Sequence, residues 1–166
     1  MKPIPFSFIE QASEKLSLLP DDELENLVDQ FSEQQPYLTA YLIASNEEDM
    51  HEDELELLFY LGIQVLFIAY SFVKNIPEIT EQTIDEVEMD NDDLITQLSE
   101  ESDSGFQQLL EDLMDQHPQG DLLQFAFLAV TEEDEEEAEL VFEDESRISA
   151  FITLKILIDC LDRVTP

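Results

Sequence analysis

The sequence is poor in the residues that sheets, disulfides and positive surfaces require. Its 166 residues include three glycines, one cysteine and six Lys and Arg. One cysteine excludes an intrachain disulfide framework and a cysteine-based zinc site. Few glycines leave little turn punctuation for strands. Because nucleic-acid phosphates are engaged by clustered Lys and Arg, the shortage of these residues argues against direct nucleic-acid binding.

The N-terminal residues also lack a targeting pattern. Met1 to Pro5 contain no apolar run of a secretory signal. Together with the single free cysteine, this indicates a reducing, cytoplasmic location.

Acidic and apolar residues are abundant. Asp and Glu number 42, which gives a formal net charge of −36, while apolar residues make up 43% of the chain and include 11 Phe. Low hydrophobicity with high net charge would indicate disorder, but this apolar content is enough to bury a core. A chain of this length is typical of one compact domain.

The longest apolar run covers residues 57–73, in which only Gln64 and Ser71 are clearly polar. It is slightly shorter than the roughly 20 residues that span a bilayer. Several acids crowd its start, Lys74 alone follows its end, and no second span is visible. We therefore expect a buried central helix and no membrane association.

Helical patterns dominate the rest. Leu24, Leu27, Val28 and Phe31 recur at the spacing of one helix face, and Asp21 or Asp22 suits the N-terminus of that helix. Pro36 ends this stretch and suits the first turn of the next helix. The predicted fold class is all-α.

The second half of the chain resembles the first. The pattern Leu27, Val28, Phe31 and Pro36 corresponds, 82 residues later, to Leu109, Leu110, Leu113 and Pro118. Residues 40–48 align with 126–134 at an offset of 86, and the closing helix aligns at an offset of 91. The shared order is helix, proline, aromatic helix, acidic run and apolar helix. This order predicts one compact domain built from two similar multi-helix units, in pseudo-twofold packing or as a short HEAT-like solenoid. A chance match between amphipathic helices is the alternative.

The predicted organisation has three parts. Residues 1–76 form the first helical unit, 77–103 an acidic linker or short helices, and 104–166 the second helical unit. The closing helix, 148–164, carries Lys155, Asp159, Asp162 and Arg163, so it is expected to keep a wetter face than the first unit's long helix.

Motifs for catalysis or metal binding are weak. Forty-two carboxylates produce acidic pairs at every spacing, so such pairs carry little information. Glu48 and His51 have the Glu-x-x-His spacing of di-iron bundles, but no second pair exists. Residues 90–95 lack the EF-hand glycine. His117 suits a helix C-terminus, and Cys160 lies among apolar residues. We expect no enzyme, no cofactor and no metal.

The distribution of charge is the remaining signal. Residues 1–83 carry a net charge of −14 and residues 84–166 carry −22. Ten acids lie within residues 132–145, and a corresponding acidic run lies within 47–54, so a duplication would place both on related faces. The candidate partner-binding residues are Glu47, Glu48, Asp49, Glu52, Asp53, Glu54, Glu132, Glu133, Asp134, Glu135, Glu136, Glu137, Glu139, Glu143, Asp144 and Glu145.

These residues predict a non-enzymatic protein that engages, inhibits, masks or chaperones a basic protein partner, as a DNA mimic or an immunity-type inhibitor does. The alternative is a helical scaffold or adaptor that binds a partner in an apolar groove, with acidity serving solubility. Binding through charge weakens as salt rises, whereas groove binding barely responds. The sequence leaves a homo-oligomer open.

Overall fold

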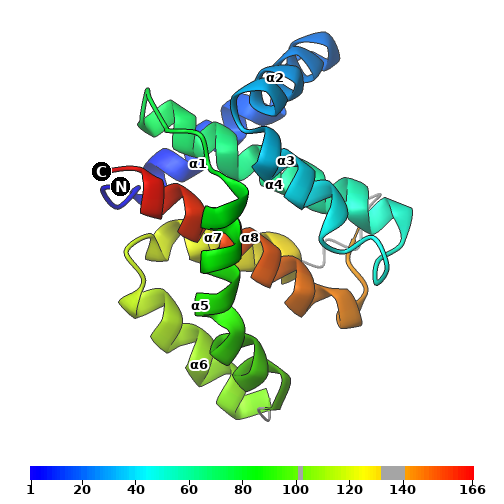
Figure 1. Cartoon of the computed structure of the whole chain (residues 1–166), viewed down its shortest axis with the longest axis vertical. Helices are drawn as coiled ribbons and strands as arrows, with labels where there is room; N and C mark the ends of the chain where they lie inside the picture. Colours follow the sequence, from blue (N-terminus) through cyan, green and yellow to red (C-terminus); the bar gives the residue numbers. More distant parts are fainter. Residues whose placement is uncertain (101–102, 132–140) are drawn as a thin grey trace.

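The computed structural model describes residues 1–100, 103–131 and 141–166, and these form eight α-helices with no strand among them (Figure 1). The all-α prediction is therefore confirmed. In chain order the helices are α1 (Phe6–Ser17), α2 (Asp21–Gln34), α3 (Pro36–Ala44), α4 (Glu52–Phe72), α5 (Glu81–Glu100), α6 (Asp103–Gln116), α7 (Gly120–Thr131) and α8 (Asp144–Val164).

Local sequence explains where the early helices begin and end. Asp21, Asp22 and Glu23 fill the first turn of α2, where carboxylates favour the positive end of the helix dipole. Pro36 opens α3 directly after α2 ends, as expected, because proline lacks the N–H that the first turn leaves unbonded.

Two long helices form the centre of the molecule. α4 packs against α1, α2, α3, α7 and α8, and α8 packs against α4, α5 and α7. α8 is as deeply buried as α4, so the expectation of a wetter closing helix was wrong. Its charged residues Lys155 and Asp159 are directed toward α5, where they find partners.

α4 has the length and apolar composition of a membrane-crossing helix, and within residues 1–100, 103–131 and 141–166 it is the one helix with both. Half of its most apolar window is buried inside the protein. The central position expected for this helix agrees with its contacts to five other helices.

The segment expected as a linker or short helices is mostly one 20-residue helix. α5 buries Ile84, Val87, Asn91 and Leu98, a spacing that directs one face inward. That face packs against α8 and α3. The many carboxylates of α5 occupy its other faces, which explains why its composition resembled that of a linker.

Two buried glutamines fasten the chain segments that lead into α1 and α5. Gln35, just before α3, accepts a hydrogen bond from the Ile79 N–H (2.8 Å) and donates to the Pro77 carbonyl and the Tyr70 hydroxyl. Gln119, just before α7, accepts from the Ile4 N–H at 3.1 Å. Its amide donates to the Lys2 carbonyl and the Asp162 carboxylate.

Candidate functional site

The first acidic run covers the turn between α3 and α4 and the first turn of α4. Asn46 is buried, and its amide donates to the Thr153 hydroxyl of α8 at 2.8 Å. Met50 is also buried at the other end of the turn. These two anchors hold the turn against the core, and Glu47, Glu48 and Asp49 are left exposed between them.

The start of α8 lies beside the start of α4. Glu143 donates its backbone N–H to Glu54 Oε1 at 2.9 Å, and His51 donates its backbone N–H to Glu54 Oε2 at 3.0 Å. The His51 imidazole also lies 3.7 Å from the Glu143 carboxylate. The beginnings of the two helices therefore share one carboxylate.

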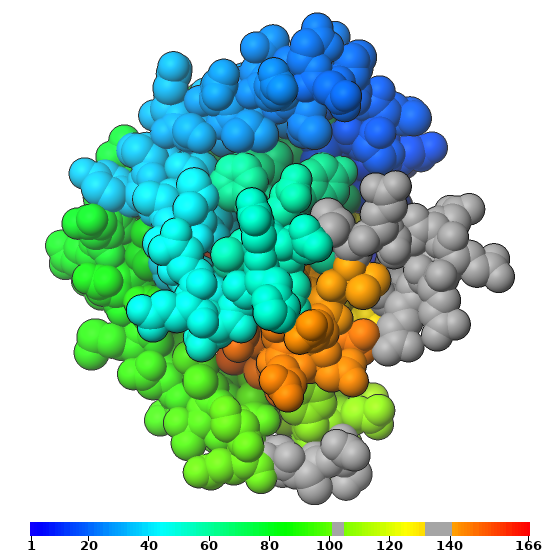
Figure 2. All heavy atoms as spheres, turned by 90° about the vertical axis from the view of Figure 1, so that its right-hand side faces the viewer, coloured from blue at the N-terminus to red at the C-terminus, as the bar shows by residue number. Residues whose placement is uncertain are grey.

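This junction brings eight exposed carboxylates onto one part of the surface. In Figure 2 the turn and start of α4 lie against the start of α8. We call this surface the acidic face. Its residues are Glu47, Glu48, Asp49, Glu52, Asp53, Glu143, Asp144 and Glu145. The predicted residues Glu132, Glu133, Asp134, Glu135, Glu136, Glu137 and Glu139 lie outside the described residues.

Glu54 does not belong to the acidic face. Its residue is 4% exposed. Burial favours a higher pKa, but the hydrogen bonds from the Glu143 and His51 backbones outweigh burial and lower the pKa of the Glu54 carboxyl. Glu54 therefore stays ionised as a structural acceptor, and its predicted role in partner binding is corrected.

Helix dipoles explain part of the acidic face. Glu52 and Asp53 lie in the first turn of α4, and Asp144 and Glu145 in the first turn of α8. Two helix N-termini side by side concentrate partial positive charge, which carboxylates compensate. The turn residues Glu47, Glu48 and Asp49 precede the helix and have no such role.

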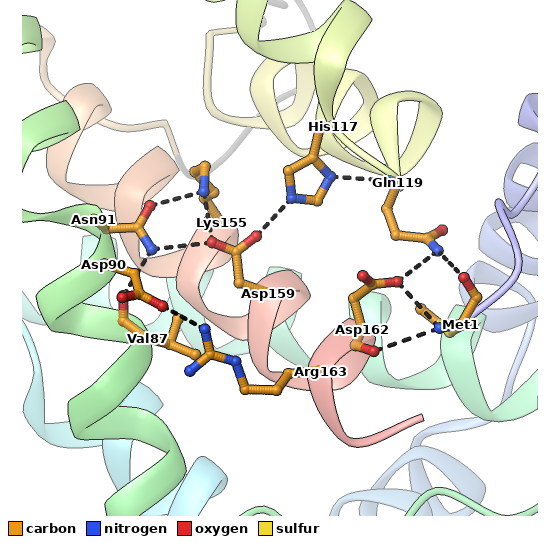
Figure 3. Close-up of polar contacts among 10 residues, drawn as sticks. All are labelled: Met1, Val87, Asp90, Asn91, His117, Gln119, Lys155, Asp159, Asp162 and Arg163. Atoms are coloured by element: carbon orange, nitrogen blue, oxygen red, sulfur yellow. Dashed lines mark hydrogen bonds and ion pairs between the residues drawn. The ribbon is translucent and has the colours of Figure 1, made fainter. Parts of the chain in front are cut away.

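A second charged cluster lies between α5 and α8 (Figure 3). The Lys155 ammonium group donates to Asn91 Oδ1 at 2.7 Å and to Asp159 Oδ2 at 2.5 Å. The Asn91 amide donates to the same Asp159 oxygen at 3.0 Å. Beside this group, Arg163 pairs with Asp90 and Glu86 of α5.

His117 completes the cluster from the α6–α7 turn. Its Nδ1 accepts the Gln119 backbone N–H at 2.9 Å, so the proton of the neutral ring sits on Nε2, which donates to Asp159 at 2.6 Å. Burial favours a higher pKa for Asp159, but His117 and Lys155 outweigh burial and lower it. His117 is therefore a bridge to α8 rather than the helix cap predicted from sequence.

The N-terminus joins the same end of the cluster. The Met1 ammonium donates to the Thr165 carbonyl at 2.6 Å and lies 3.3 Å from the Asp162 carboxylate. The two ends of the chain lie side by side as a result (Figure 1). Every charged group of this cluster has a partner within the protein. The cluster is therefore structural, and it holds α5, the α6–α7 turn and the N-terminus against α8.

Residues considered for metal binding or reactivity do not assemble a site. Across the described ranges, no group of three or more His, Cys, Asp or Glu side chains is placed to hold a metal ion. The His51 side chain is 79% exposed beside Glu143. Burial, followed by the charge of Asp159, raises the pKa of the Cys160 thiol to about 12, so this thiol is unreactive.

Comparison with known proteins adds no assignment to this geometry. No protein-family model matches the sequence, and no curated protein or solved structure is significantly similar to it.

Proposed function

We propose that the chain is a non-enzymatic acidic binding protein that engages and masks a basic protein in the cytoplasm. The observation that carries this proposal is the acidic face, in which exposed carboxylates from two distant parts of the sequence converge. Three of them, Glu47, Glu48 and Asp49, stabilise no helix end. Carboxylates that the fold does not need are available to a partner.

The amount of charge suits a partner that normally binds nucleic acid. A compact domain of this length has a radius of gyration of roughly 15 Å and a diameter of about 40 Å. Duplex DNA of that length presents about 24 phosphates, at one per ~1.7 Å. The net charge of −36 exceeds this number, and such a field would steer a basic protein toward the chain.

We also infer that the chain is a tandem duplication of a four-helix unit. α4 and α8 both have 21 residues. Gln35 directly precedes α3 and Gln119 directly precedes α7, and each accepts a hydrogen bond from the segment that leads into the first helix of the other half. Reciprocal hydrogen bonds between the two halves favour closed pseudo-twofold packing over an open HEAT-like solenoid.

The same relation bears on the acidic face. His51 and Glu143 both precede the first residue of their long helix, and they lie 3.7 Å apart. Glu54 and Ser146 both occupy the third helical position, and they share a hydrogen bond. Counted by position in the two long helices, one residue away from the sequence alignment at an offset of 91, these residues match, and in a twofold arrangement matching residues touch where the axis passes. We therefore infer that the pseudo-twofold axis passes near the starts of α4 and α8, beside the acidic face.

A scaffold that binds through an apolar groove is the second candidate. A groove of about 800 Å³ lies between α1 and α7 and is lined partly by Phe6, Phe125 and Leu128. Phe6 is 37% exposed and Leu128 is 47% exposed, which is high for large apolar side chains. Apolar docking predicts binding that resists salt.

A salt-resolved capture experiment separates the two candidates. The tagged protein is incubated with native lysate, and bound proteins are eluted by stepwise salt and identified by mass spectrometry. The proposal predicts basic, nucleic-acid-binding proteins released at moderate salt, and their DNA binding should be inhibited by the purified chain. A neutral partner that resists salt favours the scaffold, and capture of no partner contradicts the proposal.

Matched variants test the acidic face itself. E47Q/E48Q/D49N removes three exposed charges from the turn, and E25Q/D29N/E33Q removes three exposed charges from α2. The first variant should lose the basic partner and the second should retain it. Equal loss from both would assign binding to total charge rather than to this surface.

A further inference from the structure

A groove between α3 and α5 combines an aromatic floor with an acidic rim. Its volume is about 510 Å³. The floor contains two tyrosines, two alanines and one isoleucine, and the rim contains three carboxylates of α5. The lining residues are Tyr37, Ala40, Tyr41, Ala44, Ile84, Glu81, Asp85 and Glu88.

The rim carboxylates are regularly spaced. Glu81, Asp85 and Glu88 follow the i, i+4, i+7 pattern, so they lie along one face of α5 over about 10 Å. Glu81 and Asp85 are exposed, and Glu88 is half-buried. Among the described residues that line this groove none is basic, so these residues do not neutralise its charge.

The tyrosines add a polar and aromatic surface. The Tyr41 hydroxyl is hydrogen-bonded to Glu88, and burial, followed by the Glu88 charge, raises the pKa of Tyr41, so the phenol stays neutral. Tyr37 is 42% exposed at the same groove. Neutral aromatic rings beside carboxylates suit a guanidinium group, which pairs with the acids and stacks on the rings.

The groove between α1 and α7 serves as an internal comparison. Counted from Ile4 and Ile79, whose N–H groups are bound by Gln119 and Gln35, the residues of α1 that correspond to Glu81, Asp85 and Glu88 are Phe6, Glu10 and Ser13. Of these three positions only that of Glu10 carries a carboxylate in the α1–α7 groove, so packing does not demand carboxylates at the positions of Glu81 and Glu88.

We infer that the α3–α5 groove receives a helical segment of the basic partner, with arginines spaced to meet Glu81, Asp85 and Glu88. This inference rests on the proposed function and assigns part of the binding to one groove. Each of the two helices also carries an exposed large apolar side chain: Ile43 of α3 is 54% exposed and Met89 of α5 is 71% exposed. Charge complementarity therefore selects the partner, and apolar contacts anchor it.

A designed peptide tests the inference directly. The probe is a capped, fluorescent, alanine-based helical peptide with arginines at i, i+4 and i+7 and two leucines beside them. The control peptide carries citrulline, the uncharged analogue, in place of each arginine. Fluorescence anisotropy measures the Kd at low salt, and NMR follows the side-chain signals of Tyr37 and Tyr41.

Three protein variants locate the binding. E81Q/D85N/E88Q neutralises the rim. Ala40→Lys places a positive charge, which repels the arginines of the peptide, at an exposed position of the floor. E25Q/D29N/E33Q removes the same residue types from exposed positions of α2. We expect the rim variant to raise the Kd about tenfold, since three ion pairs are lost, and the α2 variant to raise it less than about twofold. Far-UV circular dichroism confirms that each variant is folded.

The outcomes separate this inference from the proposed function. Selective weakening by the rim variant and Ala40→Lys, with shifted tyrosine signals, supports the groove. Equal weakening by the rim and α2 variants overturns it, as does equal affinity for the citrulline peptide. If the wild-type chain binds protamine but not the peptide, only the groove fails. If it binds neither, the proposed function fails as well.

Discussion

Asp159→Asn should be strongly destabilising, because Asp159 joins three elements of the fold. Its carboxylate accepts hydrogen bonds from His117, Asn91 and Lys155, and its side chain is 17% exposed. An amide in its place leaves the Lys155 ammonium, whose side chain is 8% exposed, without a counter-charge. Breaking a buried ion pair costs about 3–5 kcal/mol, and residual solvent access favours the lower end, so we expect a loss of about 3 kcal/mol.

Urea denaturation followed by circular dichroism measures this loss as a shift of the midpoint at constant m. Asp90→Asn is the matched control. Asp90 also pairs with a basic residue of α8, Arg163, but the two side chains are 62% and 40% exposed, so we expect a loss of less than about 1 kcal/mol. If both variants lost the same free energy of unfolding, Asp159 would not be the residue that holds these elements together.

The pH dependence supplies a second check with a definite sign. The pKa of Asp159 is lower in the folded protein than its ordinary value of about 3.9, so the folded state favours the ionised form. Its contribution is therefore present in full above about pH 5 and is lost as the pH falls through 3.9 toward the folded pKa. The stability difference between wild type and Asp159→Asn should shrink over that range, and a constant difference would contradict the mechanism.

Three further outcomes follow from buried contacts. Gly62→Ala should cost about 1–3 kcal/mol in thermal unfolding, since a Cβ there would lie 2.5 Å from Leu42 Cδ1; an unchanged Tm would contradict this close approach. Cys160 should resist thiol reagents in the native protein and react in concentrated urea, because burial raises its pKa; rapid native labelling would be inconsistent with that burial. Gln35→Ala and Gln119→Ala should each cost about 2 kcal/mol, since each leaves a backbone N–H without its acceptor; clearly unequal losses would argue against matching roles.

Short-range patterns in the sequence were sufficient to predict the all-α class and the helices α2 and α3. The apolar spacing in residues 24–31 and the position of Pro36 determine α2 and α3, and both depend on neighbouring residues alone. α5 was harder to predict, because its acidic composition resembles that of a linker. Its buried face becomes distinct only when α8 and α3 are present to cover it.

The polar cluster on α8 could not be predicted, because its members are far apart in the sequence. Lys155 meets Asn91 across 64 residues, and Asp159 meets His117 across 42. One local signal was available: Lys155 and Asp159 are four residues apart on an otherwise apolar helix, which favours an ion pair within it. The sequence offered no comparable signal for the position of α5.

The structure divides the carboxylates into two groups. Some have structural work: Glu54 holds two helix starts together, Asp159 and Asp162 hold α8 to its surroundings, and the first-turn acids of α4 and α8 compensate helix dipoles. Like charges on the remaining surface repel one another and oppose the compact state. The exposed acids of the α3–α4 turn, Glu47, Glu48 and Asp49, therefore lower stability without compensating a helix end, and a basic partner is what would offset that cost.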